Sequence, residues 1–428
     1  MEKKSLGRDF WLYRGGQAVS VIGDSCGLIA MSWWILSATG SAATMSYIMA
    51  PMLFARVFLL PLFGPLGDRF ARKWLIISGD AWRGLLCLVL SAMAYSGFFK
   101  IWTVTGVYVL MGAGSALFSA GASAITPNLV AKDKLQLAMQ RGEAVNSAGQ
   151  IMGGAVGGIL VSVLGVGGAF LADGISFLAA AAASGAIAAD TRPAVSGGGS
   201  IAAWAKELSG GLRAMRNVPT LFWLGVFAAF INFAFSPINV GLPVLVKQIR
   251  NMPPWFLGAL ESSISAGVIM GSFCVGLLLR RFRGDMVMVY ATVFLGLSLA
   301  ALPHAPTVML PLFVMFCLGL VMAVINIPLN TRQIMATPDH FRARLGSVVM
   351  FMCGAMTPLG VAVTGFAISN FGLNVTFLAG GLAVAFAAPL LLAIPGFSAL
   401  MTISDEETHD YFIHQHPEAF AEQAQPKC

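Results

Sequence analysis

Charged side chains inside apolar stretches are the residues of this 428-residue chain best suited to chemistry. A charge near the centre of a bilayer costs about 2.5–3.5 kcal/mol, so a membrane protein keeps one where it pairs with an opposite charge or lines a water-filled path. Such residues recur along the chain: the acids Asp24, Asp80, Glu143, Asp173 and Glu261, and the bases Arg14, Arg56, Arg83, Arg141 and Arg332. The pattern indicates a transport pathway.

Asp24 and Arg56 are the first candidates for proton coupling. We estimate the depth of each residue from its distance along the chain to the cytoplasmic end of its apolar stretch. At about 1.5 Å per helical residue, both lie near the middle of the membrane or somewhat beyond it. A neighbouring arginine stabilises a carboxylate, and loss of that partner in another conformation favours protonation. The alternative is a static ion pair. Glu261, which has no obvious neighbour of opposite charge in the sequence, is the second proton-coupling candidate.

The other intramembrane charges favour structural roles. Asp80 and Arg83 are three residues apart and share a helix face, close to the basic cytoplasmic loop before them, so we expect a link to that loop. Arg141 and Glu143 lie near a cytoplasmic helix end and favour a similar role.

The composition indicates an all-α integral membrane protein. Hydrophobic residues make up 57% of the chain and charged residues 11%, against roughly 25% charged in soluble domains. Apolar blocks of about 20 residues match a hydrocarbon core of about 30 Å, and they must be helical because lipid offers the backbone no hydrogen-bond partner. We predict twelve spans at 10–37, 44–66, 74–97, 101–127, 136–163, 168–189, 219–247, 256–280, 286–302, 307–334, 345–370 and 374–397.

The distribution of lysine and arginine orients these spans. With the N-terminus inside, the cytoplasmic segments hold 18 of the 26 basic residues, whereas the outer side holds only Lys100, Lys247 and Arg250. This asymmetry predicts cytoplasmic termini in a bacterial plasma (inner) membrane. It also accounts for the net charge of +7 without any nucleic-acid partner.

The spans divide into two halves that resemble one another weakly. Residues 1–189 form a predicted six-helix bundle, 190–218 a cytoplasmic linker with a short amphipathic helix, and 219–397 a second six-helix bundle. The polar, acidic tail 398–428 is expected to be cytoplasmic and mobile.

Polar amides beside prolines mark candidate substrate-lining positions. Asn232 and Asn239 flank Pro237, and Asn326 and Asn330 flank Pro328. Because proline removes a backbone hydrogen bond, it can kink a helix and leave a carbonyl without its donor. The asparagine amides could bind such carbonyls or contact the substrate, and the sequence leaves both roles open.

The cysteines and histidines show no metal-site spacing, and we predict neither a metal nor a cofactor. No nucleotide-binding loop, zinc-hydrolase motif or nucleophile elbow occurs, which argues against an enzyme and leaves an ion gradient as the energy source.

The loop after the second span resembles the signature of the major facilitator superfamily. It reads Gly64-Pro-Leu-Gly-Asp68-Arg69-Phe-Ala-Arg72-Lys73, with alanine at position 71 where the family prefers glycine. The resemblance implies a twelve-helix transporter in which this loop latches the two halves on the cytoplasmic side. Asp68 would cap the start of the span 345–370, and Arg69 and Arg72 would bind acidic or carbonyl partners. Asp80 and Arg83 are assigned to the same latch.

A glycine pattern in the fifth span resembles the antiporter signature of drug-exporting members. The glycines are Gly149, Gly153, Gly154, Gly157 and Gly158, with Gly154 standing where those members have proline. Close helix packing is the plainer explanation of the same pattern.

Stretches around Asp24, Asp80 and Asp173 resemble the branch that contains macrolide-efflux and enterobactin-type siderophore exporters. For Asp173 this resemblance implies a packing role.

These features predict a monomeric, proton-coupled exporter of a small amphipathic molecule such as a drug or a siderophore, surrounded by membrane lipid. A carrier working in the opposite direction, a lysophospholipid flippase on the same fold, and a transport-dead receptor or scaffold are the alternatives.

Overall fold

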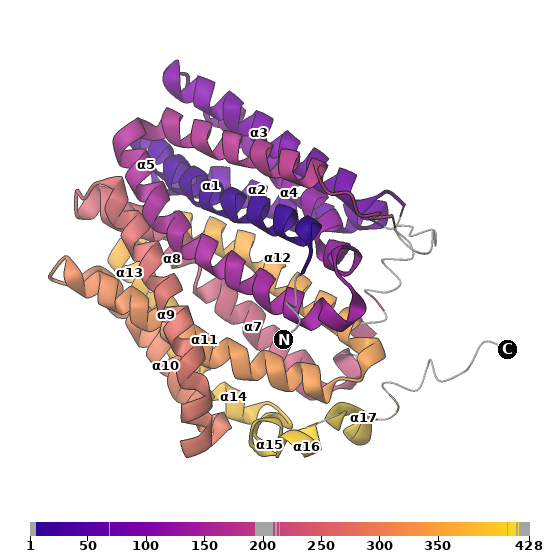
Figure 1. Ribbon diagram of the computed structural model, residues 1–428. Coiled ribbons are helices and arrows are strands. Elements are labelled where there is room, and N and C mark those ends of the chain that lie inside the picture. The colour runs from indigo at the N-terminus through magenta and orange to yellow at the C-terminus, as the bar shows by residue number, and fades with distance from the viewer. Residues whose placement is uncertain are drawn as a thin grey trace. The chain divides into compact units, whose positions relative to one another are not determined.

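The computed structural model describes residues 6–67, 69–192, 209, 212–213, 215–408, 410–416 and 418. In these residues the regular structure is helical throughout (Figure 1). Eleven helices of the described part are long and apolar enough to cross a membrane, so the prediction of an all-α membrane protein is confirmed. One of the eleven, α5, corresponds to two predicted spans, as described below.

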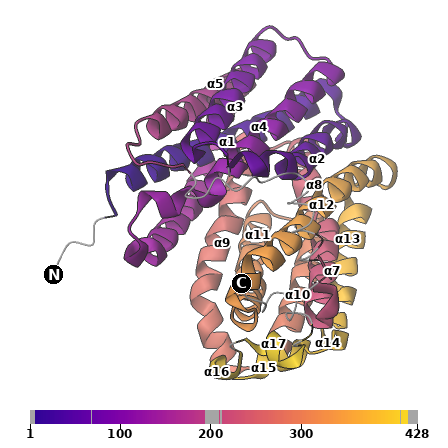
Figure 2. The same cartoon turned by 90° about the vertical axis from the view of Figure 1, so that its right-hand side faces the viewer.

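The first compact unit comprises residues 1–204, 239–265 and 361–370. Its helices in the first half of the chain are α1 (Arg8–Thr39), α2 (Ala42–Gly67), α3 (Arg72–Tyr95), α4 (Ile101–Leu129) and α5 (Leu135–Gly185), with the short turn η1 (Lys132–Lys134) between the last two. Helices α1 and α3 both pack along α5, while α2 packs against α4 (Figures 1 and 2). Helix α5 therefore contacts both α1 and α3 and fixes their positions in the first unit.

Helix α5 is 51 residues long and bends at Gly165, whose φ of 70° and ψ of −177° are not helical. Glycine adopts a positive φ readily because it has no β-carbon. The two arms of α5 on either side of Gly165 correspond to the predicted spans 136–163 and 168–189.

Three further segments complete the first unit. They are α8 (Pro237–Val244) with the π-helical turn η2 (Leu245–Ile249), the first part of α9 (Pro254–Arg281), and the end of α12 (Asp339–Phe371). The predicted span 219–247 is interrupted, because α7 (Pro219–Ala234) ends before Pro237, whose ring cannot donate a backbone hydrogen bond. By contrast, α11 (Met309–Ala336) continues through Pro328.

The second unit comprises residues 205–238, 266–360 and 371–428. Besides α7, α11 and parts of α9 and α12, it holds α10 (Gly284–Ala301), η3 (Leu302–His304), α13 (Leu373–Ala387), α14 (Leu390–Ala393), α15 (Phe397–Thr402), α16 (Asp405–Thr408) and α17 (Tyr411–Gln415). Helices α10 and α13 pack closely through Gly296 and Gly381, each of which faces the other's carbonyl oxygen.

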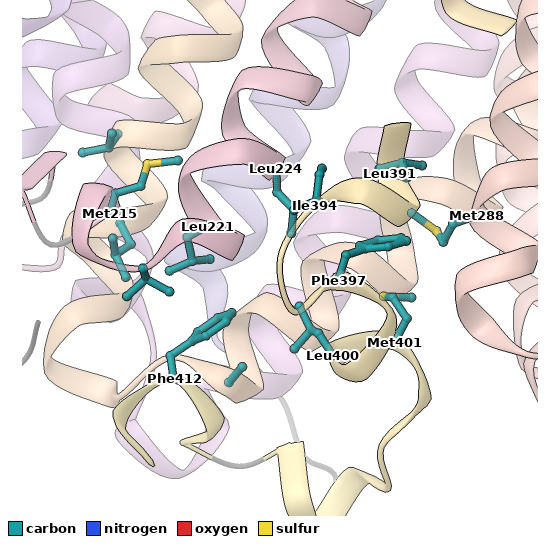
Figure 3. Packing of buried hydrophobic residues seen from close by; sticks show 14 of the residues in the cluster. Met215, Leu221, Leu224, Met288, Leu391, Ile394, Phe397, Leu400, Met401 and Phe412 are labelled. Carbon is teal, nitrogen blue, oxygen red and sulfur yellow. The ribbon is translucent and has the colours of Figure 1, made fainter. Parts of the chain in front are cut away.

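The described residues 398–408 and 410–415 of the predicted mobile tail are folded into short helices that pack on the second unit. Phe397, Leu400 and Phe412 are fully buried in one apolar cluster with Leu221 of α7 and Met288 of α10 (Figure 3). Arg332 of α11 donates hydrogen bonds of 2.6 Å to the Ile403 carbonyl and to the Thr408 hydroxyl. The predicted amphipathic helix of the linker falls mostly outside the described residues.

Candidate functional site

Helices α1 and α3 face each other through a cluster of polar side chains. Gln17 and Asp24 are two turns apart on one face of α1, and Asp80 and Arg83 are one turn apart on α3. The Gln17 amide donates to Asp80 Oδ2 at 3.2 Å, and the Arg83 guanidinium binds the other oxygen of Asp80. A second nitrogen of Arg83, Nη1, lies 4.0 Å from Asp24 Oδ2.

The two carboxylates that share Arg83 differ in exposure. The Asp80 side chain is 0% exposed and that of Arg83 is 7% exposed, whereas the Asp24 side chain is 51% exposed. The guanidinium carbon lies 4.2 Å from the ring centre of Phe177 and 4.5 Å from that of Phe118. Such contacts favour a cation. Asp24 is therefore the member of the cluster that water or a solute can reach.

The predicted pairing of Asp24 with Arg56 is not the one in the structure. Arg56 is exposed on α2 and acts on Asp24 electrostatically, but less strongly than Arg83 does. Among the described residues, the ion pair of Asp24 is with Arg83. Counting residues along two spans predicts height in the membrane but not the direction in which a side chain points. Asp80 and Arg83, predicted to support the cytoplasmic loop, contact Gln17 and Asp24 of α1 in this structure.

Asp173, in the second arm of α5, is buried beside this cluster with 1% of its surface exposed. Its Oδ2 accepts a 3.2 Å hydrogen bond from the Cys87 thiol, while its Oδ1 has no hydrogen-bond partner in the described part of the chain. The carboxyl packs against Gly23 and Gly27 of α1, where no side chain would fit. This placement agrees with the predicted packing role.

Glu261, on the part of α9 that belongs to the first unit, is half-buried. Within the described residues its carboxylate forms neither an ion pair nor a hydrogen bond. The next residue, Ser262, donates to the Ile151 carbonyl at 2.9 Å, which holds this part of α9 against α5.

The glycine pattern of α5 serves two helices at once. Gly149, Gly153 and Gly157 recur every fourth residue and face α1, where a β-carbon on Gly157 would lie 3.0 Å from Cα of Cys26. Gly154 and Gly158, one position further round the helix, face α9. A β-carbon on either would lie 2.9 Å from a carbonyl oxygen, of Gly258 and Pro254 respectively. Close helix packing therefore accounts for the glycines on both faces of α5.

The loop motif is only partly described. Asp68 lies outside the described residues, Gly64 has open space around it, and Arg69 is exposed. Arg72 donates to the Asn128 side-chain oxygen at 2.5 Å, and Lys73 donates to the Ile187 carbonyl at 2.6 Å. These two bonds join the start of α3 to the ends of α4 and α5.

The remaining charged candidates lie apart from the cluster. Arg14 donates to the Thr126 hydroxyl at 3.2 Å, and Arg141 and Glu143 are exposed. In the described part of the chain no group of His, Cys, Asp and Glu is placed to hold a metal ion.

The four asparagines are exposed. Asn232 and Asn326 donate 2.9 Å hydrogen bonds to the carbonyls of Ala228 and Met322, four residues earlier in their own helices. Their amides thus bind their own helices in this structure. Asn239 and Asn330 remain candidates for contact with substrate.

The contacts of Gln17 and Lys247 in the first unit were not predicted. Gln17 supports Asp80, as described above. Lys247 donates to the Trp33 carbonyl at 2.7 Å and to the Ser37 hydroxyl, and its ammonium lies 4.8 Å from the Trp33 ring centre. Trp33 and Ser37 lie near the C-terminal end of α1, where the helix dipole favours a positive charge. In the sequence, Lys247 was used only to orient the spans, so this contact was missed.

Bilayer-length helices with a charge cluster between them are typical of a multi-pass membrane protein. The chain belongs to the Major Facilitator Superfamily, whose model matches residues 15–361. It is 24% identical over 395 residues to macrolide efflux protein A of Streptococcus pyogenes, covering 89% of this chain and 95% of that protein. It is also 24% identical over 373 residues to the multidrug efflux pump Tap of Mycolicibacterium fortuitum, covering 83% and 88%.

Solved structures show the same fold. The D323A mutant of the nucleoside transporter NupG matches with a TM-score of 0.73 and 13% identity, over 91% of this chain and 100% of that one. A bacterial homologue of the iron transporter ferroportin, in an inward-facing state, matches with a TM-score of 0.68 and 14% identity, over 92% and 100%. At these identities the likeness concerns the fold alone.

Proposed function

We propose that this transporter exports a small amphipathic molecule in exchange for protons, as a monomer in a bacterial plasma membrane with both termini in the cytoplasm. The observation that carries the proposal is the half-exposed Asp24 carboxylate within a membrane-spanning helix, 4.0 Å from Arg83. Two relatives that match most of the chain are named as efflux proteins, which supports the outward direction.

Asp24 would bind the driving proton. When the site opens outward, the carboxylate takes up a proton and substrate leaves. When the site opens inward, the proton departs and the restored carboxylate permits rebinding. Exposure of the side chain supplies the access that both steps need, and the neighbouring cation makes the ionised form tolerable inside the membrane.

Reconstituted full-length protein tests this proposal. Proteoliposomes with an acidic lumen should accumulate radiolabelled erythromycin, a macrolide chosen because of the named relatives, and a protonophore should abolish the accumulation. Asp24→Asn should reduce accumulation to that of protein-free vesicles while leaving drug-induced quenching of tryptophan fluorescence measurable. A parallel panel of other amphipathic drugs and iron-free siderophores identifies the substrate class.

Glu261→Gln is the matched comparison because it also neutralises an intramembrane carboxylate. Accumulation that survives in Asp24→Asn but is lost in Glu261→Gln would assign the proton to Glu261. Transport into an alkaline lumen only, or none for any compound in the panel, would contradict proton-driven export.

A further inference from the structure

The charge cluster between α1, α3 and α5 holds more acids than bases. Arg83 pairs with Asp80 and lies 4.0 Å from Asp24. Asp173 is buried close by, against Cys87 of α3 and Gly27 of α1, and Arg56 adds a second positive charge that acts on Asp24. Three ionised carboxylates beside one close arginine would leave uncompensated charge in the membrane, which is costly. The cluster can therefore stay near neutrality only if protons reside on it.

Arg83 is bound unequally to its two partners. Its Nη2 forms the direct ion pair with Asp80, whereas Nη1 is 4.0 Å from Asp24, beyond hydrogen-bond range. The rings of Phe118 and Phe177 lie close to the guanidinium. A small displacement of the guanidinium would exchange one carboxylate for the other.

The polar links between α1 and α3 run through this arginine and its partner acid. Gln17 joins α1 to Asp80, and Asp24 joins α1 to Arg83, while both helices also pack on α5. A change of charge on Asp24 therefore acts on the α1–α3 connection directly.

We propose that Arg83 is a counter-ion switch, which pairs with Asp24 when that carboxylate is ionised and withdraws to Asp80 when Asp24 takes up a proton. The proton forms an O–H bond on Asp24, the Arg83–Asp24 attraction is lost, and the Arg83–Asp80 pair keeps the cation neutralised. Release of the proton reverses these changes. This inference deepens the proposed proton coupling and depends on it for its role in transport.

Other titratable groups on the surrounding helices interact electrostatically with Asp24. They are Arg56 on α2, Asp80 and Cys87 on α3, Tyr108 on α4 and Asp173 on α5. Asp173 is held by the Cys87 thiol and is fully buried, and Arg56 acts more weakly than Arg83. Arg83, by comparison, lies within 4.0 Å of two carboxylates, those of Asp24 and Asp80.

Infrared titration of the purified full-length protein in lipid nanodiscs tests the switch without any substrate. The signal is the C=O stretching band of a protonated carboxyl that disappears in Asp24→Asn.

Arg83→Gln should move the pH midpoint of that band's titration to higher pH by about one unit or more, because a stabilising positive charge is removed. Asp80→Asn should move it to lower pH, because Arg83 is then free to pair with Asp24. Arg83→Lys should stay close to wild type, and Arg56→Gln should shift the midpoint less than Arg83→Gln.

Shifts in opposite directions for Arg83→Gln and Asp80→Asn cannot arise from loosened packing alone. An unchanged midpoint in Arg83→Gln, or shifts of the same sign in both variants, would overturn the switch. If the opposite shifts appear but drug accumulation in Asp24→Asn vesicles matches wild type, the switch stands and the proposed coupling fails. Size-exclusion profiles of each variant establish that it is folded.

Discussion

The carboxyl group of Asp173 packs directly against the backbone of α1 at Gly27. A β-carbon on Gly27 would meet Asp173 Oδ2 and would lie 3.2 Å from the Cγ of Asp173. This contact joins the second arm of α5 to α1 one turn away from Asp24, so the packing of the two helices and the position of the proton-binding candidate depend on the same short stretch.

Gly27→Ala is therefore expected to destabilise the protein. An added methyl group in a well-packed interior typically costs about 1–3 kcal/mol. Gly15→Ala on the same helix is the control, since a β-carbon there has no neighbour within 4 Å and alanine favours helix formation. Thermal unfolding in detergent, followed by fluorescence size-exclusion chromatography, should give a lower melting temperature for Gly27→Ala only. Equal melting temperatures would contradict the Gly27–Asp173 contact.

Phe412→Ala is expected to loosen the C-terminal segment. The ring is fully buried in the cluster that joins α17 to α7, and deletion of a buried phenylalanine side chain costs about 3–5 kcal/mol. Phe386→Ala is the matched control, because that ring is 76% exposed. Limited proteolysis should cleave the segment 397–415 faster in Phe412→Ala. Cleavage at the wild-type rate would mean that the segment does not depend on this ring.

Asp68→Asn should impair transport more than folding. The substitution keeps the size of the side chain and removes the charge that would stabilise a helix N-terminus on the cytoplasmic side. We expect normal expression with strongly reduced drug accumulation in proteoliposomes. Asp133→Asn, in the exposed turn η1, should transport like wild type. Full transport by Asp68→Asn would reduce the loop motif to a signal for membrane orientation.

A cysteine introduced at Ser196, in the predicted cytoplasmic linker, should not react with a membrane-impermeant maleimide added to intact cells. Ser96→Cys, in the exposed turn between α3 and α4, should react, because the basic residues place that turn outside. Both are compared with the unsubstituted protein, whose native cysteines set the background. Labelling of Ser196→Cys from outside would invert the predicted orientation.

Local patterns were sufficient to predict the helices but not how their faces meet. Lipid leaves an apolar segment no alternative to helical hydrogen bonding, so most span boundaries agree with the structure to within a few residues. The same missing backbone donor at Pro237 and Pro328 predicted a kink at each, but not that the helix would end before Pro237 while α11 continues through Pro328. The burial of Phe397, Leu400 and Phe412 was not predicted, because acidic residues dominate the composition of this part of the chain.

For the charge cluster, the sequence and the tertiary structure determine different properties. The sequence alone determined that Asp24, Asp80, Arg83 and Asp173 lie inside the membrane, because the length of an apolar stretch sets the depth of each residue in it. Only the packing of α1 and α3 on α5 decided that Asp24 meets Arg83 rather than Arg56. Each helix turns its side chains by about 100° per residue, and the rotation of one helix against another is set by contacts between residues far apart in the chain.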